Sequence, residues 1–231
     1  MIQAIFFDFN GVIINDEPIQ FQAYVEVLSE YGISLTEEQY YGALGLDDAR
    51  FVLNIFEQAG GPLTEETSIR IIEAKSEIHR SLIADELPLF PGVVTFLKAA
   101  ARRYSIGLVS MARRMEIDYV LERARLDHLF SVIISAEDVS VCKPAPDCYQ
   151  QALTRLNQSR QAKRLLPLLS NECLVIEDSP PGIRSGLAAG MKTLGVTNTV
   201  TEAELRLAGA NVVTQSLADW TTDAVYHIFS D

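Results

Sequence analysis

The sequence predicts an α/β protein, a Rossmann-like doubly wound parallel sheet with an inserted all-helical cap domain. Two observations predict this fold. Short β-branched apolar runs alternate with helix-spaced segments along most of the chain, which indicates a parallel sheet with helices on both faces. Residues 18–87 break the alternation, because they carry helical periodicity and no strand pattern. A chain of 231 residues is long enough for a domain with an inserted module.

The alternating part of the chain contains six predicted strands and five predicted helices. The strands are expected at residues 2–7, 105–109, 132–135, 173–176, 192–196 and 211–213. The helices are expected at residues 93–102, 113–124, 147–156, 181–189 and 202–208. Residues 157–171 are predicted to form an extended helix–strand connection whose leucines pack inward.

The helical insertion contains four predicted helices, at residues 20–31, 36–44, 47–58 and 65–84. Thr64 precedes two glutamates, as an N-cap followed by acids in the first turn would. Proline marks both expected hinges, at residues 15–18 and 86–91. We therefore expect a core domain of residues 1–15 and 88–231 and a cap domain of residues 16–87.

The composition restricts the kinds of partner. The chain is 48% hydrophobic and 22% charged, which is typical of globular proteins. A net charge of −12 argues against a nucleic-acid partner, since nucleic-acid binding needs a basic face. No apolar stretch is long enough to span a bilayer, and the chain reaches Asp8 too early for a signal peptide. Three cysteines in no metal-ligand spacing suggest reduced thiols and a cytoplasmic protein.

Polar residues stand where the first two predicted strands end. Asp8 follows residues 2–7 and precedes Asn10 and Gly11. A carboxylate there lies at the sheet edge where open α/β sheets bind ligands, and it could act as a covalent nucleophile or merely cap a turn. Ser110 follows the second strand and could bind a phosphoryl oxygen or cap the next helix.

Two later segments complete a candidate site. Lys143 stands directly before a proline, and a fixed ammonium there would neutralise phosphate charge, although most lysines are solvated. Glu177 and Asp178 are adjacent acids at the end of the fourth predicted strand. Hard oxygen ligands of this kind suit Mg²⁺, and Asp8 would add a further ligand.

In this order, the motifs resemble those of the haloacid dehalogenase superfamily of aspartate-nucleophile phosphotransferases. The match is best at residues 8–12, 143–147, 177–182 and 188–191. The cap after the first motif resembles the subgroup that includes β-phosphoglucomutase and phosphoglycolate phosphatase. The resemblance implies that Asp8 is the nucleophile and that Ser110 and Lys143 hold the phosphoryl group. It also implies a Mg²⁺ site formed by Asp8, the backbone carbonyl of Asn10, and Asp178, with Glu177 in or near it.

Asn10 departs from the family pattern. Family phosphatases and mutases carry an aspartate there, which protonates the leaving oxygen and then activates water. Such acid–base help is worth about 10²–10⁴-fold in rate, and an amide cannot supply it. Three explanations are open: a weak or altered enzyme, replacement by the nearby acids Asp16 or Glu17, or an engineered change.

The predicted substrate-binding residues are Gly45, Arg50 and Met111. Residues 45–50 resemble the cap loop that reads substrate in related enzymes, although Arg50 could equally pair with nearby acids on its helix. Met111 follows Ser110. Gln20 and Ala112 stand where β-phosphoglucomutase-like proteins carry His and a phosphate-binding Ser, which counts against mutase activity.

The sequence thus predicts a Mg²⁺-dependent phosphatase that acts on a small phosphorylated metabolite through an aspartyl-phosphate. A sugar phosphate and a phosphoglycolate-like acid are both candidate substrates. The alternatives are a catalytically inert phosphate-ligand binder and a phosphomutase. A phosphonatase is disfavoured because Lys75, the single lysine of the cap, lies late in its last helix. We expect a monomer or weak homodimer, with no membrane partner.

Overall fold

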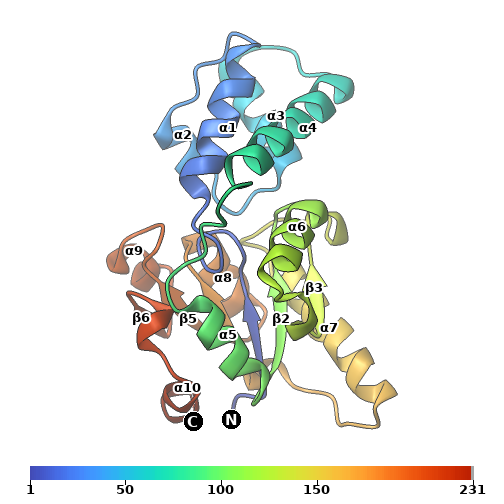
Figure 1. The fold of residues 1–231 in the computed structure, drawn as a ribbon, viewed down its shortest axis with the longest axis vertical. Helices are drawn as coiled ribbons and strands as arrows, with labels where there is room; N and C mark the ends of the chain where they lie inside the picture. Colours follow the sequence, from blue (N-terminus) through green and yellow to red (C-terminus); the bar gives the residue numbers. More distant parts are fainter. Residues whose placement is uncertain (230–231) are drawn as a thin grey trace.

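The computed structural model describes residues 1–229, and its centre is a six-stranded parallel sheet (Figure 1). The strand order is β3-β2-β1-β4-β5-β6. The strands are β1 (Ala4–Phe7), β2 (Ser105–Val109), β3 (Val132–Ile134), β4 (Cys173–Glu177), β5 (Lys192–Val196) and β6 (Val212–Thr214). Each lies within a residue or two of its predicted range, so the predicted doubly wound parallel sheet is confirmed.

Helices cover both faces of this sheet. One face packs against α5 (Val93–Ala101), α6 (Arg114–Ala124) and α10 (Thr222–Ile228), the last of which the sequence did not predict. The other face packs against α7 (Asp147–Ala162) and α8 (Pro180–Ala188), and α9 (Glu202–Leu207) packs on α8. In β1, Ile5 and Phe7 enter the first core and Ala4 and Phe6 the second. A strand buried on both faces in this way explains why its sequence is continuously apolar.

Single-turn 3-10 helices complete the core. They are η1 (Asp127–Leu129), η2 (Ala136–Asp138), η3 (Ser170–Glu172) and η4 (Leu217–Asp219).

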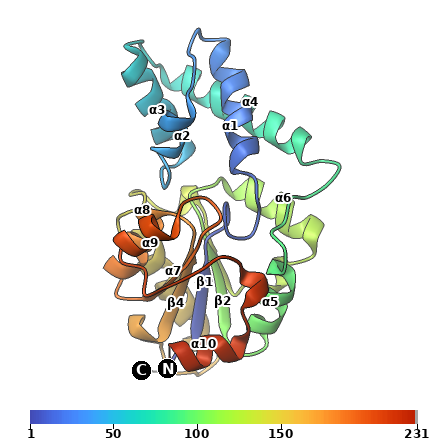
Figure 2. The same ribbon diagram turned by 90° about the vertical axis from the view of Figure 1, so that its left-hand side faces the viewer.

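Four helices lie together beyond the carboxyl end of the sheet (Figure 2). They are α1 (Glu17–Ser29), α2 (Glu37–Tyr41), α3 (Asp48–Ala59) and α4 (Glu65–Leu82). They enclose a hydrophobic core of their own, in which the rings of Tyr24 and Phe51 lie 4.3 Å apart. Thr64 caps α4 as predicted, because its hydroxyl accepts a hydrogen bond from the backbone of Thr67. We call these helices the cap; the boundaries 16 and 87 stay a prediction.

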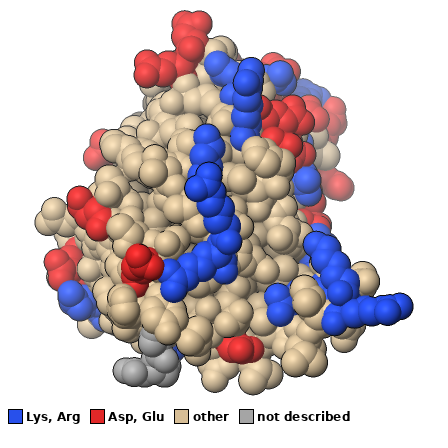
Figure 3. Space-filling model, turned by 60° about the horizontal axis from the view of Figure 1, so that its bottom comes forward, with Lys and Arg blue, Asp and Glu red and all other residues tan. Residues whose placement is uncertain are grey.

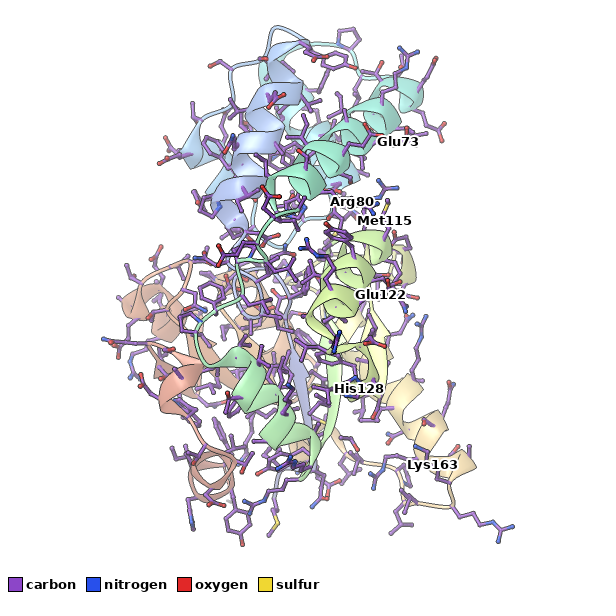
Figure 4. All side chains as sticks on the ribbon, in the orientation of Figure 1. Glu73, Arg80, Met115, Glu122, His128 and Lys163 are labelled. Carbon is purple, nitrogen blue, oxygen red and sulfur yellow. The ribbon has the colours of Figure 1, made fainter. Side chains whose placement is uncertain are left out.

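The cap touches the core on two sides. On one side, the Arg80 guanidinium of α4 lies 4.5 Å from the centre of the Tyr119 ring of α6, and Arg80 and Met115 mark this junction in Figure 4. On the other side, the backbone N–H of Asp47 donates to Cys142 Sγ at 3.4 Å. These contacts place the cap directly over the carboxyl edge of the sheet.

The prediction that residues 157–171 pack their leucines inward is wrong for most of them. Helix α7 continues to Ala162 and carries Lys163 away from the sheet (Figure 4). Leu168 alone among the four leucines is buried, since it packs in the hydrophobic core beside α7, and Asn157 both donates to and accepts from its backbone. The exposed leucines are Leu165, Leu166 and Leu169.

Three further observations bear on the predicted setting of the protein. Within residues 1–229, no helix is both long and apolar enough to cross a membrane. The three cysteines are free. On the face shown in Figure 3, which brings the end away from the cap forward, basic and acidic side chains are interspersed among uncharged ones.

Candidate active site

The candidate site lies at the carboxyl edge of the sheet, where β1 and β4 are neighbours. From these two central strands the sheet continues in opposite directions, through β2 and β3 on one side and β5 and β6 on the other. Ligands of doubly wound sheets bind at such a switch point. Asp8 follows β1, Ser110 follows β2, and Asp178 follows β4, so residues distant in sequence lie together beneath the cap.

Lys143 is the fixed cation of this edge. Its side chain is only 2% exposed, which excludes a solvated surface lysine. Its Nζ lies 3.0 Å from Asp8 Oδ1 and 2.6 Å from Glu177 Oε1, and it donates to the Val109 carbonyl at 3.3 Å. Burial alone would lower the pKa of Lys143, but the carboxylates of Asp8 and Glu177 outweigh burial and raise it. Lys143 therefore stays charged beside the predicted nucleophile.

Glu177 uses both carboxylate oxygens to hold its neighbours. Its Oε1 accepts from Lys143 Nζ at 2.6 Å and from the Tyr149 hydroxyl at 2.9 Å, while Oε2 accepts from Ser179 Oγ at 3.0 Å. A methyl group at Gly182 would come within 1.9 Å of Oε1, so the glycine lets α8 approach this carboxylate. These bonds orient Glu177 toward Lys143. Asp8 and Asp178 accept fewer hydrogen bonds than Glu177 does.

Asp8, Glu177 and Asp178 form a group that fits a divalent cation. One oxygen from each lies within 4.8 Å of the others. Burial raises the pKa of Asp8 to about 7, with Glu177 adding to the shift and Lys143 opposing it. Burial, followed by Glu177 and Asp8, holds the pKa of Asp178 well above its usual range. Buried acids that repel one another in this way are stabilised by a bound cation, and their oxygens suit Mg²⁺.

Gly11 makes room for this group. It has φ +74°, which favours glycine, and a Cβ there would come within 1.9 Å of Asp178 Oδ2. The turn after β1 therefore requires glycine for two reasons, its backbone conformation and the approach of the Asp178 carboxylate.

The side chain of Asn10 belongs to a buried network that the sequence did not predict. Its Nδ2 donates to both oxygens of Asp16, at 3.0 and 2.9 Å, and its Oδ1 lies 3.5 Å from Ser110 Oγ. Asp16 is fully buried, and its Oδ2 also lies 2.8 Å from His79 Nε2 and 3.2 Å from Gln20 Nε2. The sequence offered one signal of this contact, an acid six residues after Asn10. An aspartate at that position is equally expected as the residue that precedes a helix.

Glu17, the other acid considered as a replacement, lines the cavity beneath the cap. The Tyr40 hydroxyl of α2 donates to its Oε2 at 2.6 Å. Burial raises the pKa of Glu17 to about 7, with the charge of Asp16 adding to the shift and the Tyr40 hydrogen bond opposing it.

The cap side of the cavity holds a second buried lysine. Lys75 Nζ lies 3.0 Å from Asp48 Oδ1, 3.0 Å from Glu116 Oε1 and 3.2 Å from Gln20 Oε1. Burial alone would lower the pKa of Lys75, but Asp48 and Glu116 outweigh it and raise the pKa. A Schiff-base lysine needs the opposite shift, so this environment adds to the argument against a phosphonatase. Within the described structure, Asp48 Oδ2 and Glu116 Oε2 are buried without a hydrogen-bond partner.

Two of the three predicted substrate-binding residues line the cavity. Gly45 and Met111 lie on its wall. Arg50 is not among the residues lining it; it forms an ion pair with Asp47 and donates to the backbone carbonyl of Ser140. This pairing with a nearby acid is the alternative that the sequence had left open.

The fold and site define a protein with a doubly wound α/β core whose acidic switch-point site is covered by a helical cap. The chain matches the model of the haloacid dehalogenase-like hydrolase family over residues 5–196. The protein therefore belongs to the haloacid dehalogenase-like hydrolase family, as the motifs of the sequence indicated.

Curated relatives and solved structures agree with this assignment. A phosphorylated carbohydrates phosphatase of Thermotoga maritima is 26% identical over 213 residues, which cover 90% of this chain and 92% of that protein. Protein SUPPRESSOR OF QUENCHING 1 of Arabidopsis thaliana is 28% identical over 94% of this chain, but the match spans only 20% of that protein. A β-phosphoglucomutase structure from Clostridium difficile shares the fold, with a TM-score of 0.86, 23% identity and coverage of 100% and 98% of the two chains.

Proposed function

We propose that the protein is a Mg²⁺-dependent phosphatase of a small phosphomonoester and that Asp8 forms an aspartyl-phosphate. The observation that carries the proposal is the placement of Lys143 Nζ, 3.0 Å from Asp8 Oδ1 and fixed by Glu177. A nucleophile beside an immobile cation is the arrangement that phosphoryl transfer needs, since its catalysis consists mostly of positioning and charge stabilisation.

Each residue has a distinct part in this proposal. Asp8 and Asp178 would hold Mg²⁺, which neutralises charge on the phosphoryl oxygens when bound. Asp8 also attacks phosphorus, while Lys143 and Ser110 bind the phosphoryl oxygens. Glu177 keeps Lys143 in position. The cap excludes bulk water from the aspartyl-phosphate until hydrolysis.

We further propose that the substrate carries a neutral, hydroxyl-rich body, as in sugar and polyol monophosphates. Asp48 Oδ2 and Glu116 Oε2 offer two buried acceptors that have no donor in the described structure. Hydroxyl groups would supply those donors. A carboxylate or second phosphate would instead meet acids there, because Lys75 is already paired with both of them. The name of the Thermotoga maritima relative, a phosphatase of phosphorylated carbohydrates, supports the same class.

A panel of phosphomonoesters with and without Mg²⁺ tests this function. Sugar and polyol monophosphates should be hydrolysed fastest. Phosphoglycolate and sugar bisphosphates should be hydrolysed at least about tenfold more slowly, because placing like charges next to each other is unfavourable by more than that factor. The matched control is Asp8→Ala, which removes the nucleophile. Turnover of wild type no greater than that of Asp8→Ala would refute the phosphatase.

Two alternatives have specific support. Asn10 favours an inert phosphate-ligand binder, which would bind phosphate with Mg²⁺ and show no steady-state turnover. The fold shared with β-phosphoglucomutase favours a phosphomutase, which requires a bisphosphate and would isomerise sugar phosphates. The acidic end of the cavity disfavours the bisphosphate.

The remaining expectations are also proposals. A cytoplasmic location is supported by the three free cysteines. A monomer or weak homodimer with a small phosphorylated metabolite as its ligand, and no nucleic-acid partner, stays a prediction from composition.

A further inference from the structure

We propose that Glu17, positioned by Tyr40, is the general acid and base of this site in place of residue 10. This inference rests on the proposed phosphatase function. It concerns how protons move, which the family resemblance leaves open for a chain with an amide at position 10.

The surroundings of Asn10 are built for an amide. Its Nδ2 donates to both oxygens of Asp16, at 3.0 and 2.9 Å. An aspartate at position 10 would bring a second carboxylate to about the same distance from Asp16, and two such groups cannot both ionise. Asn10 is therefore matched to Asp16, and this protein is not simply a family enzyme with one acid removed.

Asp16 does not take over proton transfer. It is fully buried, and its carboxylate accepts from Asn10, while Oδ2 also contacts His79 and Gln20. It is absent from the residues that line the cavity. Its role is to fix the linker between β1 and α1, which brings the next residue, Glu17, to the cavity.

Glu17 reaches the cavity with one carboxylate oxygen that has no hydrogen bond among the described residues. It lines the same cavity as Asp8 and Lys143. The Tyr40 hydroxyl fixes Oε2 at 2.6 Å, and among the described residues Oε1 accepts no hydrogen bond. One oxygen is thus anchored while the other is available to a leaving group or a water molecule.

The charges around Glu17 keep both protonation states accessible near neutral pH. Burial is the largest cause of a pKa raised to about 7, and Asp16 and Asp8 raise it further. The Tyr40 hydrogen bond and the ammonium of Lys75 lower it. A group that gives up a proton in one step and takes one in the next works best with a pKa near the working pH.

The proposed proton path balances over the two steps. In the first, an Asp8 oxygen bonds to phosphorus, the ester P–O bond breaks, and the leaving oxygen takes the Glu17 proton. In the second, water bonds to phosphorus and gives a proton to the Glu17 carboxylate. The P–O bond to Asp8 then breaks, and its electron pair returns to the Asp8 carboxylate. Inorganic phosphate leaves, and Glu17 is protonated again.

The test compares wild type with Glu17→Gln on two esters. Glycerol phosphate has a poor leaving group that needs a proton, whereas p-nitrophenolate leaves without one. Glu17→Gln should lower kcat/KM for glycerol phosphate by about 10²–10⁴-fold and much less for p-nitrophenyl phosphate, and the aspartyl-phosphate should accumulate. The matched control is Glu26→Gln, an exposed glutamate on the same helix, which should change neither.

The pH profile distinguishes catalysis from structural support. In wild type, kcat/KM for glycerol phosphate should fall above pH 7 as Glu17 ionises, and Glu17→Gln should lack this limb. Tyr40→Phe removes the hydrogen bond that lowers the Glu17 pKa, so the limb should move to higher pH. An unchanged profile in both variants would contradict the assignment.

Asn10→Asp supplies an independent test. We expect no gain in turnover, because the new acid would share a proton with Asp16 instead of offering it to substrate. A gain of about 100-fold or more, typical of a restored acid, would overturn the role of Glu17. A folded wild type that binds phosphate with Mg²⁺ but never turns over would overturn it too. A folded wild type that neither turned over substrate nor bound phosphate with Mg²⁺ would overturn the proposed function itself.

Discussion

Two buried lysines line the cavity, one from the core and one from the cap, and they invite comparison. The Lys143 cluster consists of Lys143, Asp8, Glu177 and Tyr149; the Lys75 cluster consists of Lys75, Asp48, Glu116 and Gln20. Each lysine is at most 3% exposed and has two carboxylate oxygens within 3.0 Å. The Lys143 cluster is built within the core, whereas the Lys75 cluster joins α1, α3 and α4 of the cap to α6 of the core.

The two clusters differ in how completely their acids are satisfied. Both oxygens of Glu177 accept hydrogen bonds, whereas Asp48 and Glu116 each keep one buried oxygen without a donor in the part of the chain described. An unsatisfied buried acceptor costs about 1–3 kcal/mol. A cost of this kind is recovered if substrate hydroxyls occupy the site. The Lys143 cluster is therefore suited to the chemical step and the Lys75 cluster to recognition of the substrate.

Among changes to the two lysine clusters and their surroundings, removing the charge of Lys143 should have the largest effect. Lys143→Met should lower kcat by about a thousandfold, since one preorganised phosphoryl contact is worth that much. It should also cost about 3–5 kcal/mol in the free energy of unfolding, because Asp8 and Glu177 lose their buried counter-charge. Steady-state kinetics and chemical denaturation measure the two effects.

The exposed Lys163, at the end of α7, gives the control Lys163→Met, which should change neither quantity. A Lys143→Met enzyme within tenfold of wild type would show that Lys143 is structural.

Removing the charge of Lys75 should have a smaller effect on turnover and a larger one on substrate binding. Lys75→Met leaves Asp48 and Glu116 facing each other and removes two ion pairs, one that joins α4 to α3 and one that joins α4 to α6. We expect kcat/KM for a sugar monophosphate to fall about a hundredfold, mostly through a rise in KM. The reason is that cap residues far from the phosphoryl group would bind the substrate equally well in the ground state and in the transition state. Separate measurement of kcat and KM decides the point. If kcat alone fell, the division between the two clusters would be wrong.

Neutralising one acid of the Lys75 cluster tests the recognition of hydroxyl groups. Glu116→Gln keeps the shape of the side chain but halves its acceptor capacity. KM for a sugar monophosphate should rise about tenfold, as one lost hydrogen bond of a charged group predicts. KM for p-nitrophenyl phosphate, which has no hydroxyl groups, should stay the same. Equal changes for both esters would indicate a general effect on cap closure.

The contrast between the clusters also explains what the sequence could predict. Asp8, Ser110 and Asp178 each follow a strand, and parallel strands bring their carboxyl ends to one edge. Their approach was therefore predictable from local patterns, as was the six-stranded sheet. Lys75 and Glu116 lie 41 residues apart on helices of different parts of the chain. Their contact depends on how the cap sits over α6, and no local periodicity contains that information.

Position 10 illustrates the same limit more closely. The sequence showed that Asn10 lacks an acid and named Asp16 and Glu17 as replacements, but could not choose between them. The proposed choice of Glu17 follows from the turn after β1, which buries Asp16 against Asn10 and leaves Glu17 at the cavity. Either of two adjacent side chains at a helix start can face the cavity, so only the tertiary structure distinguishes Asp16 from Glu17.

Replacing Arg50 should have the smallest effect of these substitutions. It tests whether the Lys75 cluster extends to this neighbouring residue. Arg50 lies on α3 two residues after Asp48, but its side chain is 43% exposed and paired with Asp47. Exposed ion pairs contribute about 0–1 kcal/mol to stability. Arg50→Ala should therefore change both the unfolding equilibrium constant and kcat/KM by no more than a few fold. An arginine that contacted a substrate anion would behave otherwise, raising KM by tenfold or more when removed. Kinetics of Arg50→Ala with a sugar monophosphate and a sugar bisphosphate separate these outcomes. A large KM increase for the bisphosphate alone would place a second phosphate at the cap and favour a mutase over a phosphatase.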